Sequence, residues 1–224
     1  AVCTGARASA ASIPGLKEAG CLTNESVFSL TELPRRIGVI GAGPIGCELA
    51  QAFARFGSQV HLIETMHGVL PNEDRDAAEV LECQMAKDGV TLHCCSRGLE
   101  IVKTADGKQM TGQSHEGPYE VTVDEILLGV GRAPNVEGFG LERAGVAFSA
   151  GGVSVDSRLQ TTNPRIFAAG DVCSRYKFTH AADAMAQIVV QNALFPHPFG
   201  LGYASVDSLI VPWCTYTEPE IAHV

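Results

Sequence analysis

The segment that most restricts the fold is a glycine-rich turn at residues 41–46. The apolar run Arg36–Ile40 precedes it, and apolar residues at helical spacing follow it as far as Gly57, which predicts a strand, a turn and a helix. Glycines at the first, third and sixth positions suit a tight turn, close approach of a ligand to the backbone, and close packing of helix on strand. The helix start would offer free N–H groups and partial positive charge to an anion such as a pyrophosphate.

An acid follows the next predicted strand, at a distance typical of a dinucleotide site. The strand Gln59–Ile63 leads into Glu64, whose carboxylate could accept both hydroxyls of an adenosine ribose. An acid there repels a 2′-phosphate, and the segment Thr65–His67 contains no Arg or Lys. The sequence therefore favours NADH over NADPH, with NADPH kept as the alternative.

Composition excludes several classes of partner. The chain has 224 residues, enough for one or two domains, and a net charge of −9, which disfavours nucleic acid or an anionic membrane as a partner. No segment has the apolar length of a membrane span, and the start does not resemble a signal peptide. We expect a cytoplasmic protein with neither nucleic-acid nor membrane partners.

The cysteines and histidines show no metal-ligand spacing. Eight cysteines are scattered without a Cys-x-x-Cys pair, so we expect reduced thiols. Cys94 and Cys95 end a predicted strand, where their side chains would point to opposite faces. We interpret them as structural residues, not as a metal or redox pair, and we predict no metal site.

The first half of the chain alternates strands and helices, which predicts an α/β fold with a parallel sheet. After the second strand we expect an acidic helix at Asn72–Lys87 and a strand at Val90–Cys95. Short runs separated by Gly-containing turns then predict an antiparallel meander, with Leu99–Lys103 and Tyr119–Val123 as strands. Glu125–Val130 returns as a buried strand, and Thr31 is a plausible cap for an early helical turn.

The second half has the pattern of another nucleotide-binding domain. Ile166–Asp171 is predicted to be a buried strand ending in an acid, followed by a helix at Thr179–Leu194. Ala1–Ala6 has the pattern of a strand end, so we expect sequence before it. The predicted division is a partial nucleotide-binding domain at 1–34, an inserted nucleotide domain at 35–150, a return to the first domain at 151–208 and a β-rich unit at 209–224.

Four separated motifs carry a family resemblance. They are Thr4-Gly5-Ala6, Gly41–Glu48, Gly129–Asn135 and Ala168–Val172. Together they resemble the FAD-dependent pyridine nucleotide-disulfide oxidoreductases. Thr179–Ala184 and Tyr216–Glu220 are most similar to mercuric reductase-like and dihydrolipoamide dehydrogenase-like members, and the resemblance extends over essentially the whole chain.

The resemblance implies a Rossmann-like NAD-binding domain inserted in a partial FAD-binding domain, plus the start of a dimerisation domain. It implies NAD contacts at Gly41, Ala42, Gly43, Pro44, Ile45, Gly46, Glu48, Glu64 and Gly131. It implies FAD contacts at Thr4, Gly5, Ala6, Arg132, Gly170, Asp171, His180 and Ala181, with Asp171 on the ribityl chain.

Structural alternatives stay open at several of these positions. Asp171 could cap the segment that follows it, and Glu48 could be a surface acid of the helix. The Gly131–Asn135 segment could simply be a turn that ends a strand. His180 is better explained as a structural residue than as a general base.

The implied activity is hydride transfer from NADH to FAD, then electron transfer to a redox cysteine pair and an acceptor, in a homodimer. The acceptor would be mercuric ion, lipoamide, another disulfide or oxygen, and a mercuric reductase-like enzyme is the first choice. The chain contains neither the flavin glycine motif, nor the Cys-x4-Cys pair, nor the acid–base His-Glu pair of complete members, so we expect an internal fragment without catalytic residues.

Two other classes of function remain as alternatives. One is a stand-alone NAD-binding module without turnover, which would have no reason to carry the flavin strand. The other is a dehydrogenase without flavin, which needs a Ser-Tyr-Lys or His-Asp group that the sequence does not supply.

Overall fold

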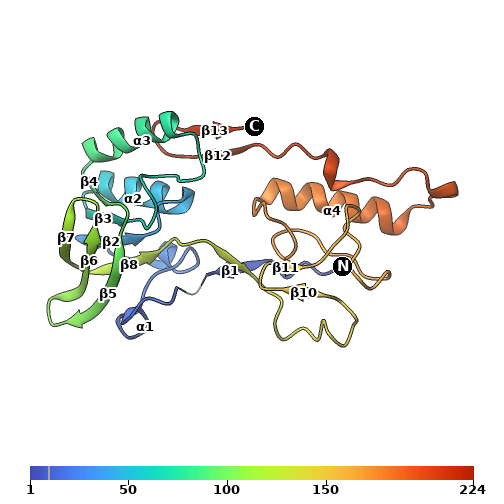
Figure 1. Cartoon of the computed structure of the whole chain (residues 1–224), viewed down its shortest axis with the longest axis horizontal. Coiled ribbons are helices and arrows are strands. Elements are labelled where there is room, and N and C mark those ends of the chain that lie inside the picture. The colour runs from blue at the N-terminus through green and yellow to red at the C-terminus, as the bar shows by residue number, and fades with distance from the viewer. Residues whose placement is uncertain (10) are drawn as a thin grey trace. The chain divides into compact units, whose positions relative to one another are not determined.

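The chain forms two compact units in the computed structural model, which describes residues 1–9 and 11–224 (Figure 1). Unit 1 comprises Ala1–Arg7, Arg132–Trp213 and Val224, and unit 2 comprises Ala8–Gly131 and Cys214–His223. Each unit has hydrophobic clusters of its own. Within the described residues, no helix has the length and apolar character needed to cross a membrane.

Unit 2 is built on a four-stranded parallel sheet. Its strand order is β4-β3-β2-β8, with Ile40 paired to both Ile63 and Leu128 across the sheet. The predicted α/β class with alternating strands and helices is confirmed. The sheet strands and their two helices are β2 (Arg36–Ile40), α2 (Pro44–Phe56), β3 (Gln59–Ile63), α3 (Arg75–Lys87), β4 (Val90–His93) and β8 (Glu125–Leu128).

The predicted antiparallel meander is also present, with one strand more than the sequence indicated. It runs β5-β6-β7 in order. Its strands are β5 (Arg97–Thr104), β6 (Gly107–Ser114) and β7 (Gly117–Val123). The middle strand β6 is mostly polar, which is why the sequence did not mark it, but its Met110 is fully buried.

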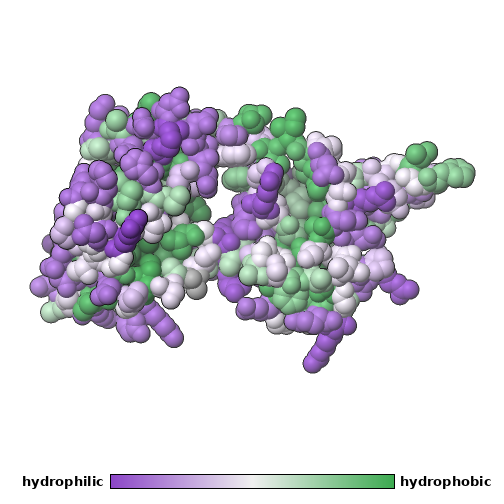
Figure 2. Space-filling view, viewed as in Figure 1, coloured by the Kyte–Doolittle hydropathy of each residue, from purple (hydrophilic) through white to green (hydrophobic). Residues whose placement is uncertain are grey.

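The helices cover one face of the parallel sheet and the meander covers the other. Alternate residues of each strand point to each of these layers. Ile37 and Val39 belong to one buried cluster with helix residues such as Ala50 and Leu81. Ile40 and Ile126 belong to a second cluster with Met110 of the meander. Because successive side chains of a strand point to opposite faces, a sheet covered on both sides needs apolar residues at nearly every position. Figure 2 shows hydrophilic side chains over much of the outer surface, with hydrophobic ones gathered in patches.

The C-terminal residues of unit 2 pack against α2. Ile221 is buried in the same cluster as the helix residues, and the Gln51 side chain bonds the backbone N–H and C=O of Glu218, each at 2.8 Å. This segment includes a two-stranded sheet of β12 (Trp213–Thr215) and β13 (Ile221–His223).

Unit 1 contains one long helix, α4 (Thr179–Leu194), at the predicted position. Leu159 and Ala169 pack against its buried face, which includes Met185 and Ile188. The short strands β1 (Ala6–Ala8) and β9 (Arg132–Pro134) pair, as do β10 (Phe148–Ser149) and β11 (Gly152–Val153).

The remaining elements are α1 (Leu16–Ala19), η1 (Val27–Ser29), η2 (Pro198–Gly200) and η3 (Val206–Ser208), of which α1 and η1 belong to unit 2.

Several predicted elements need correction. Ile166–Asp171 is not a continuous strand, because it makes only single-residue bridges, from Phe167 to Gln160 and from Ala168 to Val2. Thr31 caps nothing, since η1 ends at Ser29 and its N-cap is Ser26.

Two boundaries of unit 2 also differ from the prediction. Helix α3 begins at Arg75 and not at Asn72, because the Glu73 N–H donates to the Leu70 carbonyl and forms a turn first. Strand β4 ends at His93 and not at Cys95, because Cys95 has a φ of 53°, outside the strand region.

Helix α2 lies unusually close to the turn before it. A Cβ atom on Gly46 would come within 1.8 Å of the Gly41 carbonyl oxygen. We expect Gly46→Ala to lower the free energy of unfolding by ~1–3 kcal/mol or more, because backbone must move to admit the methyl group. Chemical denaturation measures this change.

Gly43→Ala is the matched control in the same turn. Gly43 has an ordinary φ of −74°, and a Cβ atom there would meet nothing within 4 Å. We expect it to cost less than ~1 kcal/mol. Equal stability of the Gly46→Ala protein and the wild type would contradict the packing argument.

An ion pair joins the starts of β2 and β8. The Asp124 carboxylate accepts from the Arg36 backbone N–H at 2.9 Å and from the Arg36 Nε at 3.1 Å. The hydrogen bond from the Arg36 side chain holds the pKa of the Asp124 carboxyl below its usual range. A lowered folded-state pKa stabilises the fold above the unfolded pKa, and this contribution is lost as pH falls through the folded value.

We therefore expect Asp124→Asn to flatten the acid limb of the stability profile. Below about pH 5, where an unfolded Asp begins to protonate, wild-type stability should fall more steeply than that of the variant. Denaturation at a series of pH values tests this, with Glu120→Gln on the exposed side of β7 as control. Parallel curves for wild type and Asp124→Asn would exclude the ion pair as a source of acid sensitivity.

Candidate functional site

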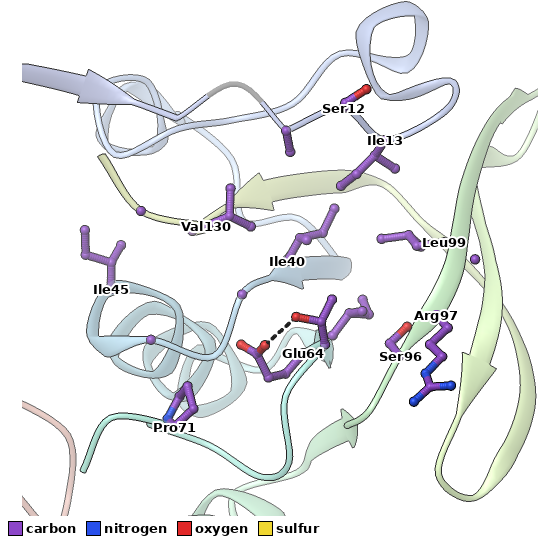
Figure 3. Close-up of a pocket in the computed structure, with 18 of the residues that line it drawn as sticks. Ser12, Ile13, Ile40, Ile45, Glu64, Pro71, Ser96, Arg97, Leu99 and Val130 are labelled. Atoms are coloured by element: carbon purple, nitrogen blue, oxygen red, sulfur yellow. Dashed lines mark hydrogen bonds between the residues drawn. The ribbon is translucent and has the colours of Figure 1, made fainter. Parts of the chain in front are cut away.

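A cavity of about 840 Å³ opens in unit 2 at the carboxyl ends of the parallel strands (Figure 3). Ligands of open α/β sheets bind at this end of the strands. Six of the predicted NAD contacts line the cavity: Gly41, Gly43, Pro44, Ile45, Glu64 and Gly131. Ala42 and Gly46 lie in the same turn without lining the cavity.

The start of α2 faces this cavity without a side-chain cap. Its N-cap Gly43 makes no side-chain hydrogen bond, and Pro44 occupies the first turn. Gly41 takes a φ of +99°, and a Cβ atom there would lie 2.7 Å from the Gly129 carbonyl oxygen. The first N–H groups of the helix therefore point toward a space that an anion could fill.

Glu64 ties the end of β3 to the glycine turn. Its Oε2 accepts from the Ala42 N–H at 2.7 Å, and its Oε1 accepts from the Met66 N–H at 2.9 Å and the Thr65 hydroxyl at 3.1 Å. The side chain is 8% exposed and lines the cavity. An ionised carboxylate has roughly four acceptor positions, so about one is left for a ligand hydroxyl.

The tertiary structure adds a basic residue that sequence reasoning missed. Arg97, at the start of β5, lines the cavity beside Ser96 and is exposed (Figure 3). The expectation that this region lacks Arg or Lys holds for residues 65–67 but not for the cavity as a whole. Ser96 N–H donates to the Glu64 carbonyl at 2.8 Å, and this bond fixes the start of β5 beside the acid.

Glu48 does not line the cavity. Its Oε1 accepts from the Tyr216 backbone N–H at 2.8 Å, so in this structure the carboxylate holds the C-terminal segment against α2. No local sequence pattern predicts this contact, because the two residues are 168 positions apart.

In unit 1 the structure brings Arg132 and Asp171 together. Arg132 Nη1 lies 2.8 Å from Asp171 Oδ2, and Nη2 donates to the Ala6 carbonyl at 3.0 Å. Asp171 is therefore an ion-pair partner and not a helix cap. Among the described residues, the Arg132 Nε is one of two buried side-chain polar atoms without a hydrogen-bond partner. A buried donor of this kind costs about 1–3 kcal/mol until an acceptor reaches it.

The other predicted flavin residues of unit 1 lie on turns and on α4. Asn135 pins the Thr4–Gly5 turn, since its carbonyl accepts from the Thr4 hydroxyl at 2.6 Å and its N–H donates to the Gly5 carbonyl at 2.9 Å. His180 is exposed and stacks on Phe178, with ring centroids 5.5 Å apart. Ala181 is buried, and Gly170 has a φ of +81°.

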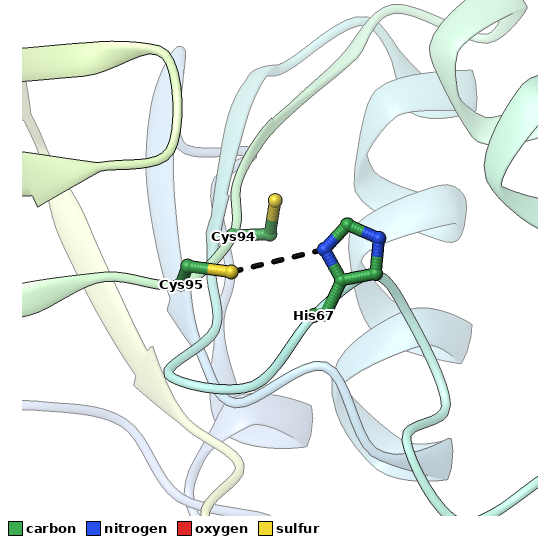
Figure 4. A group of neighbouring side chains, drawn as sticks. All are labelled: His67, Cys94 and Cys95. Atoms are coloured by element: carbon green, nitrogen blue, oxygen red, sulfur yellow. Dashed lines mark hydrogen bonds between the residues drawn. The ribbon is translucent and has the colours of Figure 1, made fainter.

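Histidines and cysteines cluster in unit 2, contrary to the prediction. His67, Cys94 and Cys95 have ligand atoms within 4.8 Å of one another (Figure 4). Since Cys95 leaves the strand geometry, the two thiols do not point to opposite faces. His61 Nδ1 also lies 3.2 Å from His93 Nε2, and burial lowers the pKa of both rings.

The sequence matches the family of pyridine nucleotide-disulphide oxidoreductases over residues 2–186. The chain belongs to this family. Its members are enzymes that use FAD and NAD(P)H. The family expectation drawn from the four sequence motifs is confirmed.

Individual relatives agree with this assignment. A dihydrolipoyl dehydrogenase of Bacillus subtilis is 37% identical over 201 residues, covering 90% of this chain and 42% of the relative. A mercuric reductase of Staphylococcus aureus is 33% identical over 224 residues, covering 100% of this chain and 40% of the relative. The chain thus spans about two fifths of the length of these curated relatives.

Solved structures of the family show the same fold. The HOCl-induced flavoprotein disulfide reductase RclA of Escherichia coli superposes with a TM-score of 0.86 at 32% identity. The match covers 98% of this chain and 49% of that one.

One cysteine of the site helix is protected. Cys47 of α2 is fully buried, and burial raises the pKa of its thiol to about 12. Because the thiolate is the reactive form, we expect Cys47 to resist alkylation at about pH 8 in the folded chain, while the exposed Cys83 of α3 reacts. Mass mapping of alkylated peptides checks this, and modification of both residues at similar rates would contradict it.

Proposed function

We propose that this chain forms the nicotinamide-nucleotide site and part of the flavin site of an oxidoreductase. The reaction is hydride transfer from NADH to FAD, followed by electron transfer to a redox disulfide and an acceptor. The observation that carries the proposal is the 840 Å³ cavity in which the glycine turn, the start of α2 and Glu64 meet. Cofactors of this kind supply the redox chemistry, and the protein binds and orients them.

In this proposal the pyrophosphate of NADH lies at the start of α2. The open space beside Gly43 and the uncapped helix N–H groups support this placement. Gly41, Ala42, Pro44, Ile45 and Gly46 shape the turn, and Gly131 also lines the cavity. Glu48 is assigned a supporting role, through its bond to the Tyr216 N–H.

Glu64 is proposed to read the adenosine ribose and to favour NADH over NADPH. Its remaining acceptor position suits one ribose hydroxyl, and its negative charge opposes a 2′-phosphate. Among the described residues that line the cavity, Arg97 is the one that bears a formal positive charge. Its charge opposes the preference for NADH over NADPH.

The flavin contacts of this chain are proposed to be the unit 1 residues. The unpartnered Arg132 Nε and the adjacent Asp171 carboxylate fit a polar ligand that offers both an acceptor and hydroxyl groups. Thr4, Gly5, Ala6, Gly170, His180 and Ala181 complete the proposed set.

The proposed domain division follows the sequence: flavin domain at 1–34 and 151–208, nucleotide domain at 35–150, and the start of a dimerisation domain at 209–224. We propose a mercuric reductase-like acceptor reaction in a homodimer. The Staphylococcus aureus mercuric reductase supports this, since its match includes all 224 residues. A dihydrolipoyl dehydrogenase-like reaction is the alternative, supported by the higher identity of the Bacillus subtilis relative.

The nucleotide site is tested by NADH titration of the 224-residue chain. We expect Glu64→Gln to weaken NADH binding about 10–100-fold, because a charge-assisted hydrogen bond of ~1.5–3 kcal/mol is lost. Gly43→Ala should also weaken binding, because its methyl group occupies the space assigned to the pyrophosphate. Calorimetry with NADH and NADPH gives both affinities.

The matched control is Glu120→Gln, which makes the same chemical change on the exposed side of β7, outside the cavity. Arg97→Ala should weaken NADPH binding more than NADH binding. Unchanged NADH affinity in Glu64→Gln, or tighter wild-type binding of NADPH than of NADH, would overturn the role given to Glu64.

The electron acceptor is tested with the natural protein in which this sequence occurs, at its full length. NADH oxidation is followed with mercuric ion or lipoamide as acceptor, with FAD bound. Turnover with mercuric ion alone supports the first choice, and turnover with lipoamide alone supports the alternative. Absence of NADH oxidation with FAD bound would overturn the redox proposal while leaving the NADH titration informative.

A further inference from the structure

Two loops at the carboxyl ends of β3 and β4 bring three metal-binding side chains together. His67 follows β3, and Cys94 and Cys95 follow β4 (Figure 4). Cys95 Sγ lies 3.7 Å from His67 Nδ1, and the ligand atoms of all three residues lie within 4.8 Å of one another. All eight cysteines are free thiols.

The backbone holds this arrangement in place. Strands β3 and β4 pair in parallel, with Ile63 opposite His93, so the residues that follow them meet at one edge. The Cys95 N–H donates to the Met66 carbonyl at 2.9 Å, which fastens one loop to the other next to His67. The Cys94 carbonyl accepts from the His115 N–H at 3.0 Å. The site is therefore organised before any ligand arrives.

The separations suit a tetrahedral metal ion. Bonds of about 2.3 Å to sulfur and 2.0 Å to nitrogen place the two ligand atoms about 3.5 Å apart at a tetrahedral angle. The distance from Cys95 to His67 is 3.7 Å. The Cys94 sulfur lies within 4.8 Å of both of these atoms.

We propose that His67, Cys94 and Cys95 form a binding site for a thiophilic metal ion of the zinc class. Thiolate and imidazole ligands select such ions over magnesium or calcium. Two thiolates balance the charge of a divalent ion, and the imidazole adds a neutral ligand. Three protein ligands leave a fourth position for water or a small ligand.

The site is open to solvent and separate from the nucleotide cavity. His67 is exposed, both cysteines are half-buried, and none of the three lines the cavity. Their neighbours Thr65 and Ser96 do line it. The metal site does not depend on the proposed function, so either can fail without the other.

The test uses cobalt(II), followed by zinc(II) competition, on the reduced 224-residue chain. We expect one equivalent of cobalt to bind with sulfur-to-metal charge-transfer absorption and tetrahedral ligand-field bands, and zinc to displace it. His67→Gln, Cys94→Ser and Cys95→Ser should each weaken cobalt binding by at least about 100-fold. Loss of a residue that only supports a metal ligand already costs up to about 100-fold, and these three residues are the proposed ligands themselves.

Cys83→Ser and Cys3→Ser are the matched controls, because they remove exposed thiols elsewhere in the chain. Both should bind cobalt as the wild type does. A second measurement needs no variant: zinc should slow alkylation of Cys94 and Cys95 but not of Cys83. Equal binding by all variants, or equal alkylation rates with and without zinc, would overturn the proposal.

Discussion

The contact between Gly46 and the Gly41 carbonyl sets the geometry on which the rest of unit 2 depends. A Cβ atom at Gly46 would lie 1.8 Å from that oxygen, so only glycine lets α2 begin so close to the end of β2. This closeness directs the helix start at the cavity and places Ala42, inside the turn, within reach of Glu64. One steric constraint thus positions both the helix start that we propose binds the pyrophosphate and Glu64, the acid that we propose binds the ribose.

Around this contact the parallel sheet makes neighbours of residues far apart in sequence. The ends of β2, β3 and β4 meet at one edge, and the segments that follow them carry Gly41, Glu64 and Cys95. The cavity and the proposed metal site of His67, Cys94 and Cys95 share this origin, since both arise where neighbouring parallel strands end. Backbone bonds from Ser96 to Glu64 and from Cys95 to Met66 join the two loops.

In unit 1 a different interaction organises the residues assigned to the flavin. Arg132 bonds Asp171 through one nitrogen and the Ala6 carbonyl through another, and its Nε has no partner. A buried N–H donor without an acceptor is costly, which is a reason to expect a ligand at the Arg132 Nε. The pair comes from two motifs that the sequence marked separately.

The sequence by itself determined the parallel β-α-β core, helix α4 and five of the residues that line the cavity: Gly41, Gly43, Pro44, Ile45 and Glu64. Each of these rests on local periodicity or on the glycine turn and the acid that follows the next strand. Only the tertiary structure decided three further features. Arg97 lines the same cavity as Glu64, the Glu48 carboxylate accepts from the Tyr216 N–H, and His67 lies close to Cys94 and Cys95. It also reduced Ile166–Asp171 to isolated bridges. Such contacts depend on strand register and on loop conformation, which bring distant residues together. Local sequence patterns predict neither of them.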